Sequence, residues 1–379
     1  MNQWLKAALP AAILLSTNLA HAEGDFKRWA VSAGWLHVMP QGNANSTRIS
    51  TAVEEGKNYK VGSALTGADL MNNSDLKTKF DEGYFKGSAL ATLGLNSLFN
   101  SFEKKPETLN NPLSTLMTKN AYSDVYGISN WSDQAGLEAD DTDTLGLTFS
   151  YFVNDNVSLE LIGGIPPKVD IKGEGQIIAS VNAVANSKWA GNGSLANQAP
   201  FIDGVNLDKD LLITDLGARG TIAKVTAWTP ALTVKYHFGK SGVNKLRPFV
   251  GAGVVYGHFN KIKLNGDVEQ DLINAGYMVD NVLNGRAAEG LHGGKGSSEA
   301  NPVVKVKTDD AFAPVVTAGF SYDLTDRWFT TASLTYMPNF NNTATITVTD
   351  SNTGNQLIKA STKVDLDPLI TYVGVGYRF

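Results

Sequence analysis

The last sixteen residues, Val364 to Phe379, read VDLDPLITYVGVGYRF, and from Leu369 onward they alternate between two kinds of side chain. One set of alternate positions is mostly apolar and ends on an aromatic residue: Leu369, Thr371, Val373, Val375, Tyr377 and Phe379. The interleaved set is mixed: Ile370, Tyr372, Gly374, Gly376 and Arg378. Because successive side chains of a strand point to opposite faces, one face suits lipid and the other a crowded interior. The pattern is typical of the last strand of an outer-membrane barrel, and the alternative is an edge strand of a soluble β-sandwich.

The composition of the 379 residues fits either alternative but excludes two kinds of site. There is no cysteine, so the chain holds neither a disulfide framework nor a thiolate metal site. Hydrophobic residues make up 42% of the chain and the mean hydropathy is −0.13. Such average values do not indicate a membrane protein, but they are expected for a barrel, in which only every second strand residue meets lipid.

The first 22 residues predict a secretory signal peptide. Lys6 is their only charged side chain, an apolar run follows from Ala7 to Leu15, and Ala20-His21-Ala22 is a small-x-small cleavage pattern, so we expect cleavage after Ala22. The mature chain, residues 23–379, keeps 31 basic and 37 acidic side chains, a net charge of −6. It has no basic block to suggest nucleic acid and no apolar stretch long enough for a membrane helix, so any membrane span must consist of strands.

Eight segments alternate as strands do, and the connections between them are sorted by length. The strand candidates are Trp29–Val38, Thr144–Val153, Asn156–Pro166, Val225–Phe238, Leu246–Phe259, Ala311–Tyr322, Arg327–Met337 and Leu369–Phe379. Short turns alternate with long connections at approximately 40–143, 167–224, 260–310 and 338–363. A soluble sandwich has no reason to sort its connections in this way. We therefore predict an all-β fold: an eight-stranded antiparallel up-and-down transmembrane β-barrel, with long extracellular loops and both termini on the short-turn side.

The long loops are expected to contain some helix. Apolar residues recur at helical spacing in Asp69–Phe102 and in Val268–Asn284, and both could form amphipathic helices. Gln176–Asn206 shows no regular pattern, and Gly290–Ser298 is rich in glycine. The apolar loop residues need a place to bury, so we expect the loops to pack together as a small extracellular cap.

Three segments together resemble the OmpW family of small outer-membrane barrels. They are TLGLTFSYFVNDNVSLELIGGIP at Thr144–Pro166, KYHFGKSGVNKLRPFVGAGVVY at Lys235–Tyr256, and LDP at Leu366–Pro368 followed by GVGYRF at Gly374–Phe379. The resemblance implies a Gram-negative outer-membrane barrel whose narrow apolar interior passes small hydrophobic solutes, which enter through the loops and leave sideways into the membrane. It also implies delivery by the barrel-assembly machinery through the terminal strand that ends at Phe379. The first three loops are larger than the family explains.

Pro166 and Pro167, at the outer end of the third strand, are the candidates for a lateral opening. Proline has no N–H for the strand ladder, so two in succession should interrupt pairing with the neighbouring strand. Pro166 matches a proline that the family links to its lateral opening. The alternative is an ordinary proline that ends a strand at a loop.

The inward-facing positions divide into a polar group and an apolar group. Ionisable candidates cluster near the periplasmic strand ends and would form a polar floor: Glu160, Lys235, His237, Arg247 and Arg378. Because buried charges must be paired or hydrated, these side chains could equally be core-filling pairs without a transport role. A narrow apolar path above them would be lined by Phe152, Ile162, Phe249, Ile370 and Tyr372.

The residues show no constellation for catalysis. The five histidines lie in separate segments, none has metal-ligand spacing with a second histidine, and no nucleophile is paired with a base. We therefore expect no enzyme, no metal and no cofactor. The leading hypothesis is a monomeric passive channel for small hydrophobic solutes, in contact with outer-membrane lipid. The alternatives are a structural or adhesive barrel whose large loops bind an external partner, and a weakly ion-conducting pore.

Overall fold

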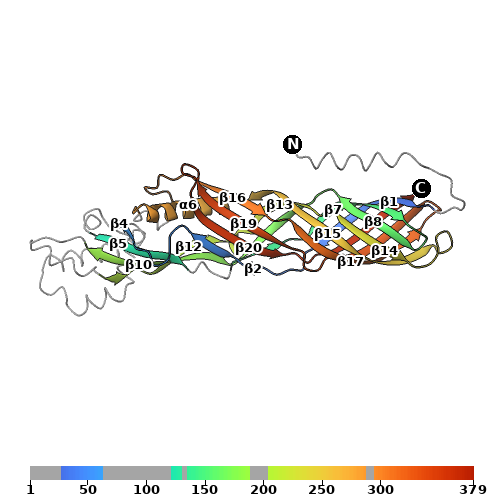
Figure 1. Ribbon diagram of the computed structural model, residues 1–379, viewed down its shortest axis with the longest axis horizontal. Coiled ribbons are helices and arrows are strands. Elements are labelled where there is room, and N and C mark those ends of the chain that lie inside the picture. The colour runs from blue at the N-terminus through green and yellow to red at the C-terminus, as the bar shows by residue number, and fades with distance from the viewer. Residues whose placement is uncertain (1–26, 63–120, 130–134, 188–203, 287–293) are drawn as a thin grey trace, which may run out of the picture.

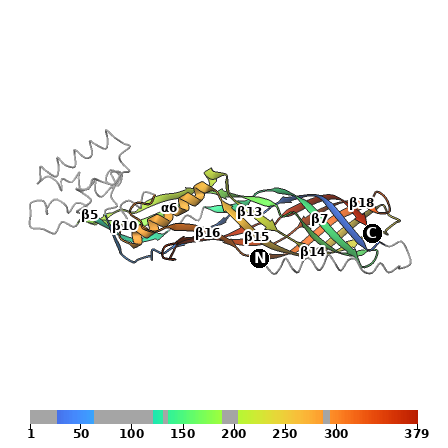
Figure 2. The same cartoon turned by 90° about the horizontal axis from the view of Figure 1, so that it is seen from above.

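A computed structural model describes residues 27–62, 121–129, 135–187, 204–286 and 294–379. The predicted signal peptide, residues 1–22, and the predicted helix at Asp69–Phe102 lie outside these ranges. The described chain forms one long molecule, with a barrel at the end that carries the C-terminus and a second β-rich region at the other end (Figures 1 and 2).

Eight strands close into the predicted antiparallel barrel. They are β1 (Trp29–Met39), β7 (Thr142–Phe152), β8 (Val157–Gly164), β14 (Ala231–His237), β15 (Leu246–Leu264), β17 (Ala311–Asp323), β18 (Trp328–Tyr336) and β21 (Leu369–Arg378). Each strand is hydrogen-bonded to the next in the order β14-β8-β7-β1-β21-β18-β17-β15, and β15 pairs with β14 to close the ring. Closure leaves no open sheet edge for lipid to meet.

The two faces of the barrel strands follow the alternation in the sequence. On β21, Val373 and Val375 are each 49% exposed, whereas Ile370 and Tyr372 are buried. On β15, the expected outward set at Val250 and Val254 is exposed and Phe249 is buried inside. The inward-facing and outward-facing side chains of the terminal strand are therefore those that its sequence predicted.

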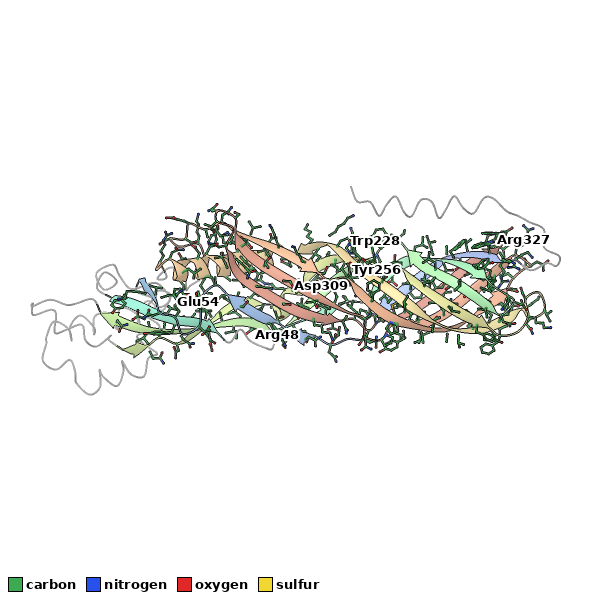
Figure 3. All side chains as sticks on the ribbon, in the orientation of Figure 1. Arg48, Glu54, Trp228, Tyr256, Asp309 and Arg327 are labelled. Atoms are coloured by element: carbon green, nitrogen blue, oxygen red, sulfur yellow. The ribbon has the colours of Figure 1, made fainter. Side chains whose placement is uncertain are left out.

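Aromatic side chains mark both ends of the lipid-facing band. At the end with the short turns, the ring centroids of Trp29 and Tyr151 lie 4.5 Å apart and those of Trp328 and Tyr377 lie 5.2 Å apart. At the other end, Tyr256 packs on Phe312 with 4.9 Å between ring centroids, and Trp228 and Tyr256 lie near the middle of the long molecule (Figure 3). We call this second set, completed by Trp35 and Tyr336, the outer aromatic girdle.

Beyond the outer girdle, the long connections fold into a tower built mainly of strands. Four strands extend the sheet that contains β15: β13 (Thr221–Trp228), β9 (Lys168–Glu174), β6 (Gly136–Ala139) and β2 (Asn45–Ser46). Four more form a second sheet: β16 (Pro302–Thr308), β19 (Asn341–Asp350), β20 (Gln356–Asp365) and β3 (Arg48–Thr51). A third sheet contains β10 (Gln176–Ser187), β5 (Ala121–Ser129), β4 (Tyr59–Gly62), β11 (Val205–Asn206) and β12 (Lys209–Asp215).

The tower strands differ from the sequence expectation in two places. The segment that showed no regular pattern contains β10, the twelve-residue strand Gln176–Ser187. The single strand expected over Val225–Phe238 is divided into β13 and β14 at Thr229 and Pro230. Proline has no N–H and fits poorly inside a continuous strand, which explains the division.

The helix expected over Val268–Asn284 is present as α6 (Gly266–Leu283), and the short helix η4 (Gly217–Arg219) precedes β13. The Asn265 side chain caps α6 by accepting a hydrogen bond from the Asp267 N–H at 2.9 Å. One face of α6 is buried in the hydrophobic core of the tower through Val268, Leu272, Ala275, Met278, Val279 and Val282. This helical spacing places the residues on one stripe. Among the described residues, no helix is long and apolar enough to cross a membrane.

Candidate functional site

An apolar cavity of about 430 Å³ occupies the outer part of the barrel and continues into the tower. Its barrel residues come from inward positions of β1, β7, β8, β18 and β21, including Leu36, Val38, Ile162, Ile370 and Tyr372. Its tower residues include Leu137, Val169, Ile171, Val225, Phe259, Ile262, Phe340 and Leu366. Ligand pockets commonly enclose about 300–1,000 Å³. The cavity is therefore large enough for a small organic molecule.

An ion pair closes the cavity on the side of the short turns. The Lys235 ammonium donates to the Glu160 carboxylate, and both side chains are almost fully buried. The other Glu160 oxygen accepts from the Ser150 hydroxyl at 2.9 Å, and the ammonium lies 4.3 Å from the centre of the Phe249 ring. These contacts compensate two charges that would otherwise be costly inside a barrel.

Tyr372 lies beside this ion pair and forms part of the same floor. Its hydroxyl and the Ser32 hydroxyl are 2.7 Å apart, and Ser32 in turn lies 2.6 Å from the Thr148 hydroxyl. The ring fits because glycines lie under it: a Cβ built on Gly374 would lie 2.5 Å from the Tyr372 hydroxyl, and one on Gly146 would lie 3.0 Å from the ring. Tyr372 therefore offers an aromatic face to the cavity and a hydroxyl to the floor.

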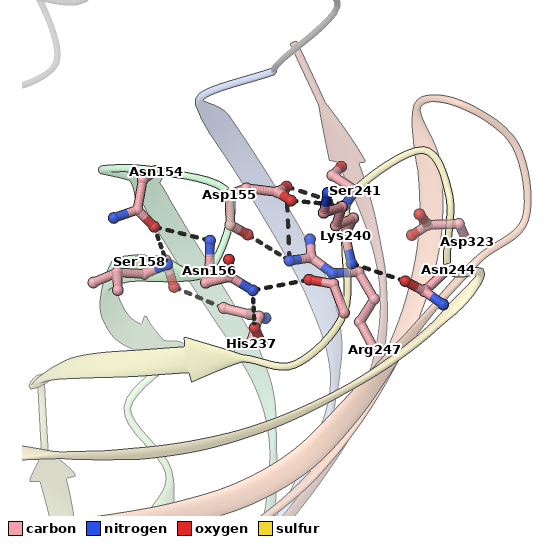
Figure 4. A network of polar contacts seen from close by, with 12 residues as sticks. Asn154, Asp155, Asn156, Ser158, His237, Lys240, Ser241, Asn244, Arg247 and Asp323 are labelled. Carbon is pink, nitrogen blue, oxygen red and sulfur yellow. Dashed lines mark hydrogen bonds and ion pairs between the residues drawn. The ribbon is translucent and has the colours of Figure 1, made fainter.

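A second polar layer lies nearer the short turns (Figure 4). The His237 Nε2 and the Ser158 hydroxyl are 2.8 Å apart, and the Asn156 amide donates to the His237 carbonyl at 2.6 Å. Arg247 is 1% exposed and donates to the Asp155 carbonyl oxygen, with its guanidinium 3.8 Å from the Asp155 carboxylate.

Arg378 extends this layer to the terminal strand. Its guanidinium binds the Asp323 carboxylate at 2.5 Å and lies 4.4 Å from the centre of the Phe329 ring. All five predicted floor residues are therefore buried in two polar layers at one end of the barrel, and each has a polar or charged partner.

The five predicted apolar lining residues do not all lie at the same level. Ile162, Ile370 and Tyr372 line the large cavity. Phe152 and Phe249 lie lower, beside His237 in the polar layers, with ring centroids 5.0 Å and 5.3 Å from the imidazole. They therefore pack against the floor, because β7 and β15 carry these inward positions towards the short turns.

The barrel wall is interrupted beside the cavity, between β8 and β14. β8 pairs with β14 as far as Ile162 opposite Ala231. Pairing resumes in the tower where the Ala227 N–H donates to the Pro167 carbonyl at 3.0 Å. Within the described chain, the residues in between, 163–166 and 228–230, are not paired across this interruption.

Residues on both sides of this interruption line the cavity and reach the outer surface. Pro166 and Pro167 lie on one side and Pro230 on the other, and none of the three has an N–H to donate. Ile165 is 59% exposed and Trp228 is 49% exposed, although both line the cavity. Gly163, opposite the exposed Leu147, has no side chain on the lipid-facing side of this place. Single residues therefore separate the cavity from the outer surface here, at the level of the outer aromatic girdle.

Sequence reasoning missed most of the tower residues of the cavity and the contribution of Pro230. Val169 and Ile171 alternate with polar residues in KVDIKGE, and Ile222 and Val225 face inward in TIAKVTAW. This short alternation is the signal that could have located them, but both segments fall in connections expected to be loops.

The model of the OmpW family matches residues 111–276 and 291–379, more than half of the chain. The chain belongs to the OmpW family. The curated Outer membrane protein W of Vibrio cholerae is 24% identical over 246 residues, which cover 65% of this chain and 78% of that protein. This OmpW-family protein is thus an outer-membrane barrel.

Solved structures of similar architecture include OprG from Pseudomonas aeruginosa, with a TM-score of 0.45, 15% identity, and coverage of 93% of this chain and 96% of that chain. Another is the E. coli Outer Membrane Protein W, with a TM-score of 0.34, 16% identity, and coverage of 93% and 98%.

Among the described residues, no group of three histidine, aspartate or glutamate side chains could hold a metal ion.

Proposed function

We propose that this OmpW-family protein is a passive channel for small hydrophobic molecules. The observation that carries the proposal is the apolar cavity, which has a charged floor on one side and an interrupted wall on another. The apolar lining offers no hydrogen-bond or charge partner to water and ions, whereas an apolar solute is stabilised by leaving water. Binding and release would need no chemistry on the solute, so the proposal assigns the protein no enzymatic activity.

The exit in this proposal is the interruption between β8 and β14. A solute held above the Glu160–Lys235 pair would pass between Pro166 and Pro230 and reach the lipid without crossing the polar floor. The entrance is assigned to the tower, since the cavity continues between its strands as far as Ile222 and Leu264. Ile222 and Leu264 also pack into the hydrophobic core around α6.

The experiment compares uptake of naphthalene by cells that express the wild type, Gly163→Phe, Gly266→Phe or no protein. Gly163 continues the lipid-facing positions Leu159 and Leu161 of β8 beside the interruption and has open space at its Cβ, so a phenyl ring there should cover the exit from the lipid side. Gly266 also has open space, but it lies outside the cavity lining at the start of α6 and serves as a matched control.

We expect uptake with Gly163→Phe to fall to the rate of cells that lack the protein, while Gly266→Phe matches the wild type. Equal uptake with and without the wild-type protein would remove the channel function. If Gly163→Phe supported uptake at the wild-type rate, only the proposed exit would be rejected.

The size of the tower favours a second candidate, an adhesive role. Three sheets and a helix form a folded structure beyond the outer girdle, and a channel for small molecules does not require that much ordered chain. An external partner would bind this tower, and adhesion and transport could coexist in one molecule.

A further inference from the structure

We propose that the base of the tower binds the phosphate groups of outer-leaflet lipids through four lysines. Lys261 and Lys263 lie on β15, and Lys305 and Lys307 lie on β16. We call these four side chains the lysine patch. This binding is independent of any solute in the cavity.

The four lysines face outward on neighbouring strands. On β16 the two lysines are two residues apart and share one face. On β15 a bulge separates Lys261, whose φ is 51°, from Lys263, and both are exposed, while Ile262 and Leu264 line the cavity. The Thr308 hydroxyl donates to the Phe259 carbonyl at 3.0 Å and joins β16 to β15 just below the patch. The ammonium groups therefore gather on one side of the tower.

The patch has no internal counter-charge. Elsewhere at the base of the tower, Lys172 binds Asp140 at 2.8 Å and Lys224 binds Asp170 at 2.9 Å. Among the described residues, none of the four patch lysines forms an ion pair. Lys263 also lies directly opposite Lys224 across the β13–β15 ladder. Because Asp170 already pairs with Lys224, Lys263 is the cation of this cross-strand pair that is left for an external anion.

Two carboxylates lie between the patch and the girdle, and they reduce the positive charge without cancelling it. Asp310 accepts from the Tyr256 hydroxyl at 2.8 Å and lies 2.7 Å from the His258 Nδ1, so both of its oxygens are occupied. Asp309 is exposed beside it. Four lysines against two carboxylates leave a net positive charge, although the whole chain is acidic with a net charge of −5.

The height of the patch points to lipid phosphate as its partner. Lys261 follows Tyr256 by five residues and Lys307 precedes Phe312 by five, which is about 17 Å along a strand and about 12–13 Å along the barrel axis at a tilt near 40°. The polar layer of a bilayer leaflet is about 5–8 Å thick, and a lysine side chain can extend several ångströms towards it. The Lys261 and Lys307 ammonium groups can therefore reach the headgroups next to the Tyr256–Phe312 pair. Lys263 and Lys305 lie seven residues from those aromatic residues, about 5 Å further along the axis, and would contact only the outermost phosphate groups.

The experiment measures binding of diphosphoryl lipid A and of dephosphorylated lipid A to the purified full-length protein in neutral detergent. We expect the wild type to prefer the phosphorylated lipid, and we expect that preference to weaken as salt rises, because exposed charges are screened. A lysine near an anionic membrane surface typically contributes a factor of about five to binding. Replacing all four patch lysines with glutamine should therefore weaken binding of the phosphorylated lipid by at least about tenfold.

A matched control removes the same number of charges elsewhere. Lys57→Gln, Lys60→Gln, Lys240→Gln and Lys295→Gln lie outside the patch and should leave the affinity near that of the wild type. The double variant Lys305→Gln/Lys307→Gln should show an intermediate loss and serves if the quadruple variant folds poorly. Equal binding of the two lipids by the wild type would overturn the proposal. So would equal losses in patch and control variants, or displacement by millimolar inorganic phosphate, which would indicate a site for free anions.

Discussion

Two charged side chains, Lys235 and Glu160, lie inside the barrel because each compensates the other. The Glu160 carboxylate accepts from the Lys235 ammonium and from the Ser150 hydroxyl, so both of its oxygens have partners. In a buried pair of this kind, the loss of one partner leaves a charge without compensation, and the desolvation cost then exceeds any packing gain.

Lys235→Met should lower the free energy of unfolding by about 3–5 kcal/mol, because it leaves Glu160 buried and unpaired. The double variant Glu160→Gln/Lys235→Met should recover most of that loss, since glutamine can still accept from Ser150. Urea unfolding in lipid vesicles measures both values. If the single and double variants lost equal stability, the charge explanation would fail and only packing would remain.

At the end of β19, Asp350 links tower stability to pH. The Asn301 N–H is the main cause that lowers the pKa of this carboxyl below its ordinary value of 3.8, and the Thr353 hydroxyl adds to the effect. A lowered pKa in the folded state means that the stabilisation is present above the ordinary pKa. It is lost as pH falls through the folded value.

Asp350→Asn should therefore destabilise the tower at neutral pH and should make its stability less dependent on pH below about 4. Amide hydrogen exchange in β19 and β20, measured from pH 7 to pH 3 with correction for intrinsic rates, tests this. An unchanged acid dependence in the variant would show that other carboxyls control it.

At the scale of the elements, the interruption between β8 and β14 arises from three prolines on two chain segments. Pro166 and Pro167 join β8 to β9, and Pro230 joins β13 to β14. Strand ladders need N–H donors on both sides, so pairing ends on each side of this point and resumes in the tower. The barrel thus remains closed below, while its wall is weakened at the girdle.

Replacing Pro166 and Pro167 with alanine restores two N–H donors and should allow the ladder to extend. We expect slower naphthalene uptake and greater protection of the amides at residues 163–167, with barrel stability kept or raised. As a control, Pro40→Ala changes a proline that lines the cavity but does not lie at the interruption. Uptake that is unchanged while amide protection rises would mean that the prolines only end a strand.

The sequence predicted the barrel elements well because lipid makes the two faces of each strand chemically different. Leu145 and Leu147 alternate with Gly146 and Thr148 strongly enough to define β7 without any knowledge of its neighbours. β10, with the sequence QIIASVNAVANS, is different because its outer face meets water and its inner face is lined mainly by alanine and valine. Strand preference depends on the neighbouring strands, which a single segment does not reveal.

The site was predicted in part for the same reason. The alternation of side chains along the strands placed Ile162, Ile370 and the five floor residues inside the barrel. It could not assign their positions along the barrel axis, so Phe152 and Phe249 were expected in the apolar path and not beside the polar floor. The tower half of the cavity depends on pairings between segments far apart in the chain, such as β6 with β9 and β13 with β15. Those pairings follow from tertiary contacts that local patterns do not encode.

At the scale of the whole molecule, the barrel and the tower share β15, whose 19 residues run from the short-turn end past the outer girdle. The cavity crosses the same boundary, so the base of the tower belongs structurally to the proposed channel. The far end of the tower is different, because β4 and β5 pair there with Gly62 opposite Tyr122. Residues 63–120 therefore connect two strand ends that already lie side by side.

Replacing residues 63–120 with a short Asn-Gly turn should join β4 to β5 as a hairpin and leave the barrel, the floor and the cavity intact. We expect wild-type naphthalene uptake by this variant, since the described lining of the cavity lies between the floor and the α6 core. If the tower is adhesive through this segment, attachment of expressing cells to a surface that binds the wild type should be lost at the same time. Lost uptake with normal attachment would instead place the solute entrance in residues 63–120 and would argue against adhesion as their role.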